Sequence, residues 1–239
     1  AKALGDKLGM KVEVFTASSY IGVIEGIGSG SVDFGLVPPF SAVLSNKQSN
    51  TKNLLVGRST SGKPGYFAEV FVRKDSDIKS IADLKGKKIA LQDVTSTAGY
   101  TFPISTIKKD TGIDATKDMK IVNMKGHDQA VISLLNGDVD AAAVFQDARN
   151  IVKKDQPNVF KDTKILKLTK PIPNDTISVR PDMNKDFQDK LKKAFKDISK
   201  TKEGHKIISE VYSHEGYTDA KDSDFDIVRK YEKEVQDMK

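Results

Sequence analysis

The chain has 239 residues, of which 38% are hydrophobic and 30% are charged. This length and composition allow one large α/β domain or two smaller ones, with roughly 70% of the unfolded surface buried, and exclude a disordered, collagen-like or simple coiled-coil protein. The absence of cysteine excludes disulfides, cysteine metal sites and thiol catalysis.

The net charge of +6 comes from lysines that alternate with aspartates, as in the stretch KDSDIKSIADLKGKK at 74–88. Nucleic-acid binding requires clustered positive charge or aromatic residues interleaved with cations, and the chain has no tryptophan. We therefore expect no nucleic-acid partner.

The longest apolar run, at 141–145, is far shorter than the ~20 residues of a membrane helix. The chain begins without a methionine or a leader-like segment, and the spacing of Ala1, Leu4 and Leu8 predicts that it opens inside an amphipathic helix. Because an α/β domain normally places a strand before its first helix, we expect that strand to precede this chain.

Hydrophobic periodicity predicts the elements in chain order. Strands are expected at 11–17, 32–37, 54–58, 66–73, 88–92, 120–124, 141–145, 165–168 and 177–179, and helices at 20–27, 38–44, 99–109, 128–136, 183–198, 204–212 and 225–235. Ser80 and Asp83 have the spacing of a capping box for one further short helix, which Gly86 ends. The repeated βα units predict open, mostly parallel sheets, in which ligands bind beyond the carboxyl ends of the strands.

Glycines at positions 26, 28 and 30 do not form a dinucleotide fingerprint, because they follow a helix instead of a strand. The loop from Thr95 to Gly99 does lie between a strand and a helix, and it offers hydroxyls and backbone N–H groups at the positive end of the helix dipole. This pattern is typical of an anion site and equally of a simple N-cap, and the spacing leaves both open.

His127 follows a predicted strand and begins a predicted helix, so its imidazole either donates to an anion or has a structural role. His205 and His214 have no ligand-like spacing, and we expect neither a metal site nor a cofactor. A hydrolase acting on a phosphorus ester is the alternative function, with Ser96, His127 and either Asp147 or Asp175 as its residues, although no G-x-S-x-G motif surrounds any serine.

Six short motifs in sequence order carry a resemblance to a known family. They are Ser19–Glu25, Pro64-Gly65-Tyr66, Ser96–Tyr100, Gly126-His127-Asp128, Gly137–Asp140 and Ile172–Asp175. In these motifs, and nearly end to end, the chain resembles the phosphonate, phosphite and phosphate substrate-binding proteins of ABC transporters.

The resemblance implies an α/β two-lobe periplasmic-binding-protein fold of type II, in which each lobe is a mostly parallel sheet flanked by helices. Lobe I would comprise residues 1–70 and 178–239, and lobe II residues 71–177. The crossing segments would fall near 66–72 and 170–177, and the lobes would close over a ligand held in the cleft.

The resemblance also implies the ligand-binding residues. Tyr20 and Tyr66 match tyrosines that face the ligand, and Ser96, Thr97 and His127 match the phosphonyl oxygen ligands. Ala98 replaces a serine of some relatives, and Asp147 and Asp175 stand at acidic positions. Two carboxylates repel an anion unless the ligand supplies donors, so we expect a protonated phosphonate or phosphite, or an aminoalkyl phosphonate. The alternative is that one of these acids caps a helix or forms a salt bridge between the lobes.

By the same resemblance, the chain is expected to be a non-enzymatic, monomeric, extracytoplasmic receptor that delivers its ligand to the permease subunits of the transporter. It would lie in a periplasm, or on a Gram-positive cell surface through a lipid anchor upstream of this chain. An anion-sensing regulatory domain would share the site and differ only in its partner.

Overall fold

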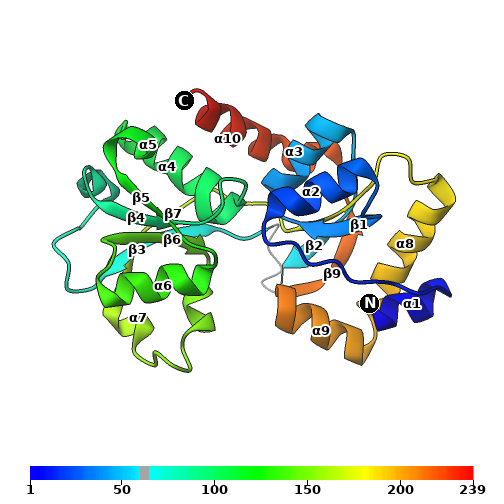
Figure 1. Ribbon diagram of the computed structural model, residues 1–239. Coiled ribbons are helices and arrows are strands. Elements are labelled where there is room, and N and C mark those ends of the chain that lie inside the picture. Colours follow the sequence, from blue (N-terminus) through cyan, green and yellow to red (C-terminus); the bar gives the residue numbers. More distant parts are fainter. Residues whose placement is uncertain (60–64, 239) are drawn as a thin grey trace. The chain divides into compact units, whose positions relative to one another are not determined.

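The computed structural model describes residues 1–59 and 65–238 (Figure 1). The chain divides into two compact units, the first formed by residues 1–65 and 173–226 and the second by residues 66–172 and 227–239. The predicted motif residue Pro64 lies outside the described residues.

Unit 1 contains a four-stranded sheet in the order β1-β8-β2-β9. The pairs β1–β8, β2–β8 and β2–β9 are all antiparallel, so the expected mostly parallel sheet is wrong for this unit. Its elements are α1 (Lys2–Leu8), α2 (Tyr20–Ser29), β1 (Phe34–Val37), α3 (Pro39–Ser49), β2 (Lys52–Ser59), β8 (Thr176–Val179), α8 (Lys185–Ile198), α9 (Lys202–Tyr212), β9 (His214–Asp219) and the 3₁₀ turn η4 (Asp222–Phe225).

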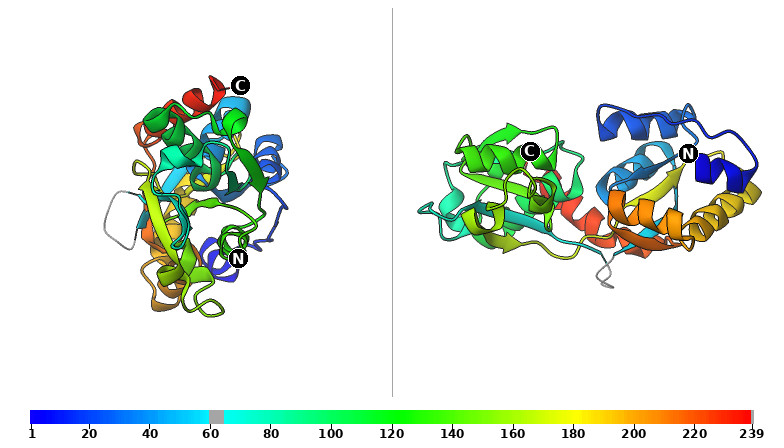
Figure 2. Two further views of the ribbon diagram at one scale, coloured as in Figure 1. Left: turned by 90° about the vertical axis from the view of Figure 1, so that its left-hand side faces the viewer. Right: turned by 90° about the horizontal axis from the view of Figure 1, so that it is seen from below.

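Two further predictions for unit 1 are wrong. Residues 11–17 alternate in hydrophobicity like a strand but form none, and Val14 and Phe15 are exposed. Conversely, β9 was missed in a region expected to be entirely helical, because its sequence HEGYTD has few β-branched residues. The predicted opening helix is present as α1, which buries Leu4 and lies beside α8 (Figures 1 and 2).

Unit 2 contains a five-stranded mixed sheet in the order β5-β4-β6-β3-β7. The strands β4, β5 and β6 run parallel, as the βα pattern predicts, whereas β3 is antiparallel to both β6 and β7. The elements are β3 (Ala68–Arg73), η1 (Ile81–Leu84), β4 (Lys88–Leu91), η2 (Thr97–Thr101), α4 (Phe102–Thr111), α5 (Ala115–Asp118), β5 (Lys120–Asn123), α6 (His127–Asn136), β6 (Ala141–Phe145), η3 (Ala148–Ile151), α7 (Val159–Asp162), β7 (Thr163–Leu168) and α10 (Asp226–Gln236).

Helices cover both faces of the unit 2 sheet, with α4 and α5 on one side and α6 on the other (Figure 1). Alternate residues of β3 divide between the two cores: Val70 and Val72 pack with Ile104 of α4, and Phe71 packs with Leu134 of α6. Burial on both faces explains why these strands are almost continuously apolar in sequence.

The last helix, α10, belongs to unit 2 by its contacts. Tyr231 stacks on Phe102 with ring centroids 4.1 Å apart, and the Ser105 hydroxyl donates to Glu234. The sequence interpretation placed this helix in lobe I, whereas its contacts group it with unit 2. Among the described residues, no helix is both long and apolar enough to cross a membrane.

Candidate functional site

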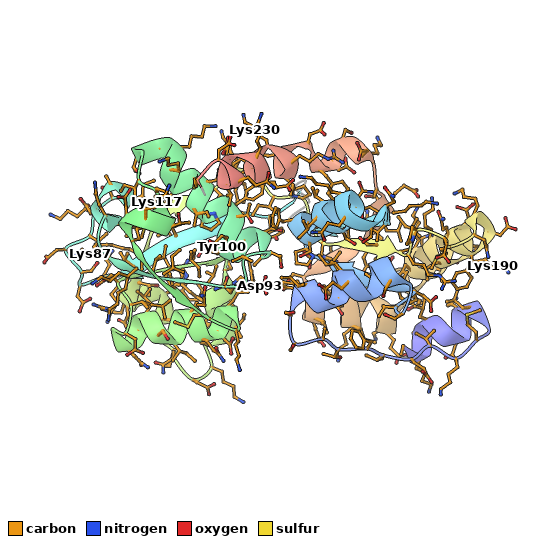
Figure 3. All side chains as sticks on the ribbon, turned by 45° about the horizontal axis from the view of Figure 1, so that its top comes forward. Lys87, Asp93, Tyr100, Lys117, Lys190 and Lys230 are labelled. Carbon is orange, nitrogen blue, oxygen red and sulfur yellow. The ribbon has the colours of Figure 1, made fainter. Side chains whose placement is uncertain are left out.

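One edge of the unit 2 sheet collects most of the predicted site residues. The parallel strands β4, β5 and β6 all end at this edge, and β3 begins there because Ala68 pairs with Phe145, the last residue of β6. Figure 3 shows the direction of β4: Lys87 precedes the strand at one end of the unit, and Asp93 follows it at the other. The six predicted residues of this unit, which lie in the loops and helix starts that flank these strand ends, are Tyr66, Ser96, Thr97, Ala98, His127 and Asp147.

The loop after β4 is folded by its own polar groups. The Asp93 carboxylate accepts hydrogen bonds from the Thr95 N–H at 2.8 Å and from the Thr95 hydroxyl at 2.6 Å, and the Asp93 carbonyl accepts from the Ser96 N–H at 2.8 Å. The Ser96 hydroxyl oxygen accepts the Gly99 N–H at 3.1 Å and so caps the wide helical turn η2. Ser96 is thus an N-cap, and its hydroxyl proton remains available as a donor.

Thr97 and Ala98 follow this cap at the first positions of η2, where the backbone N–H groups point toward the N-terminal end of the helix. Both residues are buried, with Thr97 fully inaccessible. The turn therefore presents partial positive charge in a largely desolvated position, which favours an anion. The anion-site and N-cap interpretations of this loop are compatible in the structure, because the Ser96 oxygen accepts the Gly99 N–H while the hydroxyl can still donate its proton.

His127 is the first residue of α6, next to the N-cap residue Gly126. Its ring packs edge-on against Phe145 at the end of β6, with 4.7 Å between ring centroids. Desolvation lowers the pKa of His127 to about 4, although the neighbouring Asp128 acts in the opposite direction. Its Nδ1 is buried without a hydrogen-bond partner among the described residues. A neutral imidazole with an unsatisfied nitrogen is well suited to bind a polar ligand.

Tyr66 and Asp147 complete the unit 2 edge. The main chain of Tyr66 pairs with Ile172, donating at 2.9 Å and accepting at 2.7 Å, directly before β3 begins. Asp147 follows β6 with φ of 63°, in the left-handed region. Its carboxylate is exposed and does not cap η3.

Tyr20 and Asp175 belong to unit 1. Tyr20 begins α2, capped by Ser19, whose hydroxyl oxygen accepts the Gly22 N–H at 3.3 Å. Asp175 directly precedes β8, and its carbonyl accepts the Gly57 N–H at 3.0 Å. The side chain of Asp175 is partly buried, and desolvation raises its pKa to about 6. It has no hydrogen-bond or ion-pair partner among the described residues, so its oxygens are available to accept a hydrogen bond.

The sequence interpretation missed His214 and Tyr217, two β9 residues that lie near Asp175 in the unit 1 sheet. Gly57 of β2 pairs with Tyr217 of β9 on one side and lies opposite Asp175, which precedes β8, on the other. Residues that lie directly opposite one another across strands point to the same face of the sheet, so these three positions share one face. The His214 ring occupies the space above Gly57, where an added Cβ would lie 2.4 Å from the ring, and packs edge-on against Tyr217. Desolvation lowers the pKa of His214 to about 4. Spacing gave no signal for this histidine, because its neighbours come from distant strands.

The donors at the unit 2 edge are neutral: hydroxyls, an imidazole and helix N-termini. Such donors are directional, and they distinguish the geometry of an oxyanion more sharply than a lysine point charge does. Asp147 adds an acceptor at this edge, which suits a ligand that carries both negative charge and hydrogen-bond donors.

The fold has the architecture of a two-lobe α/β periplasmic binding protein. The structure of PhnD1 from Prochlorococcus marinus in complex with methylphosphonate matches it with a TM-score of 0.84 at 16% identity, covering 98% of this chain and 90% of that one. A family model described as "ABC transporter, phosphonate, periplasmic substrate-binding protein" matches residues 1–225, and the chain belongs to this family.

Two curated relatives are also similar to the chain. The phosphonates-binding periplasmic protein of Escherichia coli K12 is 29% identical over 206 residues, which are 84% of this chain and 61% of the relative. The phosphate-import protein PhnD of Mycolicibacterium smegmatis is 33% identical over 153 residues, which are 60% of this chain and 48% of the relative. The chain therefore spans about half to three fifths of the length of these relatives.

Proposed function

We propose that this chain is the ligand-binding part of an extracytoplasmic receptor that captures a phosphonate or a related phosphorus oxyanion for an ABC transporter. The observation that carries the proposal is the convergence of Ser96, Thr97 and His127 at the carboxyl ends of the parallel strands β4 and β5. Two helix N-termini and neutral donors at one end of the sheet support an anion site there. Membership of the phosphonate-binding family supports the same function.

Capture would proceed by closure of the two units over the ligand. Tyr20 and Asp175 belong to one unit and the phosphonyl donors to the other. A ligand that contacts both sets binds a closed state more tightly than an open one and shifts the population toward it. The permease subunits of the transporter would then recognise the closed state, and the protein would act as a monomer in the periplasm or, with a lipid anchor, on a Gram-positive cell surface.

The acids narrow the ligand class. Asp175 and Asp147 both lack a described partner for their carboxylates, and an oxyanion alone would be repelled by them. We propose that the ligand supplies donors to these acids, either as a protonated phosphonate or phosphite or through the ammonium group of an aminoalkyl phosphonate. The similar proteins named above are described for phosphonates, phosphate and methylphosphonate, a range consistent with this class.

The hydrolase alternative lacks its catalytic hydrogen bonds. Within the described residues, the Ser96 hydroxyl is paired with the Gly99 N–H, His127 Nδ1 has no partner, and Asp147 makes no side-chain bond to the histidine. A triad requires serine-to-histidine and histidine-to-acid contacts. The family is a binding-protein family, which also favours a receptor over an enzyme.

Isothermal titration calorimetry with phosphite, methylphosphonate, 2-aminoethylphosphonate, phosphate and sulfate tests the proposal. We expect at least one phosphorus oxyanion to bind and sulfate, which carries no proton at neutral pH, to bind far more weakly. Sulfate binding equal to that of the best phosphorus ligand would contradict the role given to the acids. Recovery of the ligand unchanged after incubation distinguishes the receptor from the hydrolase.

A further inference from the structure

We propose that Glu69 and Arg149 are positioning residues for the ligand site: Glu69, held by Arg149, binds the main chain of Asp147 and thereby aims the Asp147 carboxylate at the ligand. This inference rests on the proposed function, in which Asp147 meets a donor of the ligand. It assigns a specificity role to two buried residues that do not themselves contact the ligand.

Glu69 is the second residue of β3 and is followed there by the apolar residues Val70, Phe71 and Val72. It lies on β3 among Ala68, Val70 and Phe71 and is only 1% exposed. Burial raises the pKa of Glu69, whereas Arg149 and the hydrogen bond from Asp147 act to lower it. A buried carboxylate in such a strand costs stability relative to an apolar residue, so its presence calls for a specific role.

The two oxygens of Glu69 divide their contacts. Oε2 lies 3.1 Å from a guanidinium nitrogen of Arg149, in an ion pair without hydrogen-bond geometry. Oε1 accepts the main-chain N–H of Asp147 at 3.2 Å. Glu69 is therefore the link between a fixed cation and the backbone of a predicted ligand residue.

Arg149 is itself fixed on several sides. Its guanidinium donates to the Thr163 hydroxyl at 3.2 Å and lies over the rings of Phe71 and Phe160, 5.6 Å and 4.6 Å from their centroids. An arginine that contacts two aromatic rings, a hydroxyl and an acid is restrained on several sides, which suits it as a support for Glu69.

The supported residue needs such a support. Asp147 adopts φ of 63° and ψ of 16°, a left-handed conformation that costs a non-glycine residue free energy. The hydrogen bond to Glu69 stabilises this conformation at the end of β6. Held in this conformation, the Asp147 side chain stays exposed at the sheet edge. It has no described partner and does not fold back to cap η3.

Two double variants separate positioning from the burial of charge. E69Q/R149M removes both buried charges and keeps a carbonyl oxygen that accepts the Asp147 N–H, whereas E69L/R149M removes the charges and that acceptor. Both variants retain similar volume and leave no unpaired ion. The readout is the affinity of 2-aminoethylphosphonate divided by that of methylphosphonate, measured by calorimetry on the full chain.

We expect E69Q/R149M to keep the affinity ratio of the unmodified chain and E69L/R149M to reduce it about tenfold or more, with methylphosphonate affinity less affected. The same ratio in both variants, whether retained or lost, would overturn the proposal. D147N serves as the reference for full loss of the acidic contact, because asparagine tolerates the left-handed conformation.

Amide hydrogen exchange of Asp147 tests the inference without any ligand. Protection of this amide in the unmodified chain and in E69Q/R149M, and its loss in E69L/R149M, is the expected result. If the unmodified chain binds no phosphonate, the proposed function fails while this measurement still decides on the contact. If E69L/R149M does not fold, the unmodified protein alone still tests the contact. The inference would be overturned if its Asp147 amide exchanged as fast as an amide in an unstructured chain.

Discussion

Gly99 lies against the side chain of Gln92 so closely that a Cβ added to the glycine would meet Gln92 Oε1 at 1.6 Å. The Gln92 N–H donates to the Gly99 carbonyl at 3.0 Å, and its side-chain amide donates to the Ala143 carbonyl at 3.2 Å. Gln92 thus joins the loop after β4 to β6 and holds the turn that carries Ser96 and Thr97.

Gly99→Ala is expected to lower the free energy of unfolding by about 1–3 kcal/mol through overpacking and to weaken methylphosphonate binding at least tenfold. Gly112→Ala is the control: this glycine has φ of 78° with no atom within 4 Å of an added Cβ. It should cost about 1 kcal/mol of stability and leave binding unchanged. Adding Gln92→Ala to Gly99→Ala makes room for the methyl group, and failure of this double variant to recover any binding would contradict the steric account.

His127→Phe should weaken phosphonate binding by about tenfold or more, because a hydrogen bond to a charged group contributes ~1.5–3 kcal/mol and phenylalanine keeps the edge-on packing against Phe145. Calorimetry measures the change. Lys125→Ala is the control, since Lys125 is exposed beside the same helix start and lies outside the predicted site. An equal loss in the lysine variant would show that the anion is held by lysine charge.

Asp175→Asn should stabilise the ligand-free chain at pH 8 while weakening 2-aminoethylphosphonate binding. The pKa of Asp175 is raised to about 6 from 3.8, so the native state disfavours the carboxylate and its stability falls as pH rises through about 6. The gain is at most about 3 kcal/mol at pH 8 and vanishes below about pH 4. Urea denaturation across pH 4–8 measures it. Asp147→Asn, at an exposed carboxylate, serves as the control variant.

His214→Phe should reduce the acid sensitivity of folding. The pKa of His214 is lowered to about 4 from 6.5, so the unfolded chain binds the proton first and native stability falls as pH decreases from about 6.5 to 4. Each such histidine contributes up to about 3 kcal/mol of this loss, and His127 acts in the same direction. Phenylalanine retains the aromatic contact with Tyr217. Denaturation at pH 7.5 and pH 4.5 should show a smaller difference in stability for His214→Phe than for the control His205→Asn, whose histidine forms a partly buried pair with Glu215. Equal differences would contradict the assignment.

Much of unit 2 was predictable because its signals are local. The strand at 141–145 and the helix that Gly137 ends were both predicted, and the capping box of Ser80 and Asp83 is present. The placement of Ser96 and His127 at helix starts after strands was also predictable, since strand-loop-helix order is a property of neighbouring residues. Their approach to one sheet edge follows from the parallel pairing of β4 with β5.

The ion pair of Glu69 and Arg149 could have been suspected only in part. An acid inside the stretch YFAEVFVR is a visible anomaly, but its partner lies 80 positions away and only the pairing of β3 with β6 brings them together. The same reason hid the packing of His214 over Gly57.

The sequence by itself determined the two-unit α/β organisation, the family resemblance and the local starts and ends of most helices and strands. Only the tertiary structure decided that the unit 1 strands pair antiparallel, that 214–219 is a strand, that 11–17 is not, and that α10 packs on Phe102. Side-chain periodicity reports which face of an element is buried, whereas strand direction and helix placement depend on hydrogen bonds and contacts with residues far away in the chain.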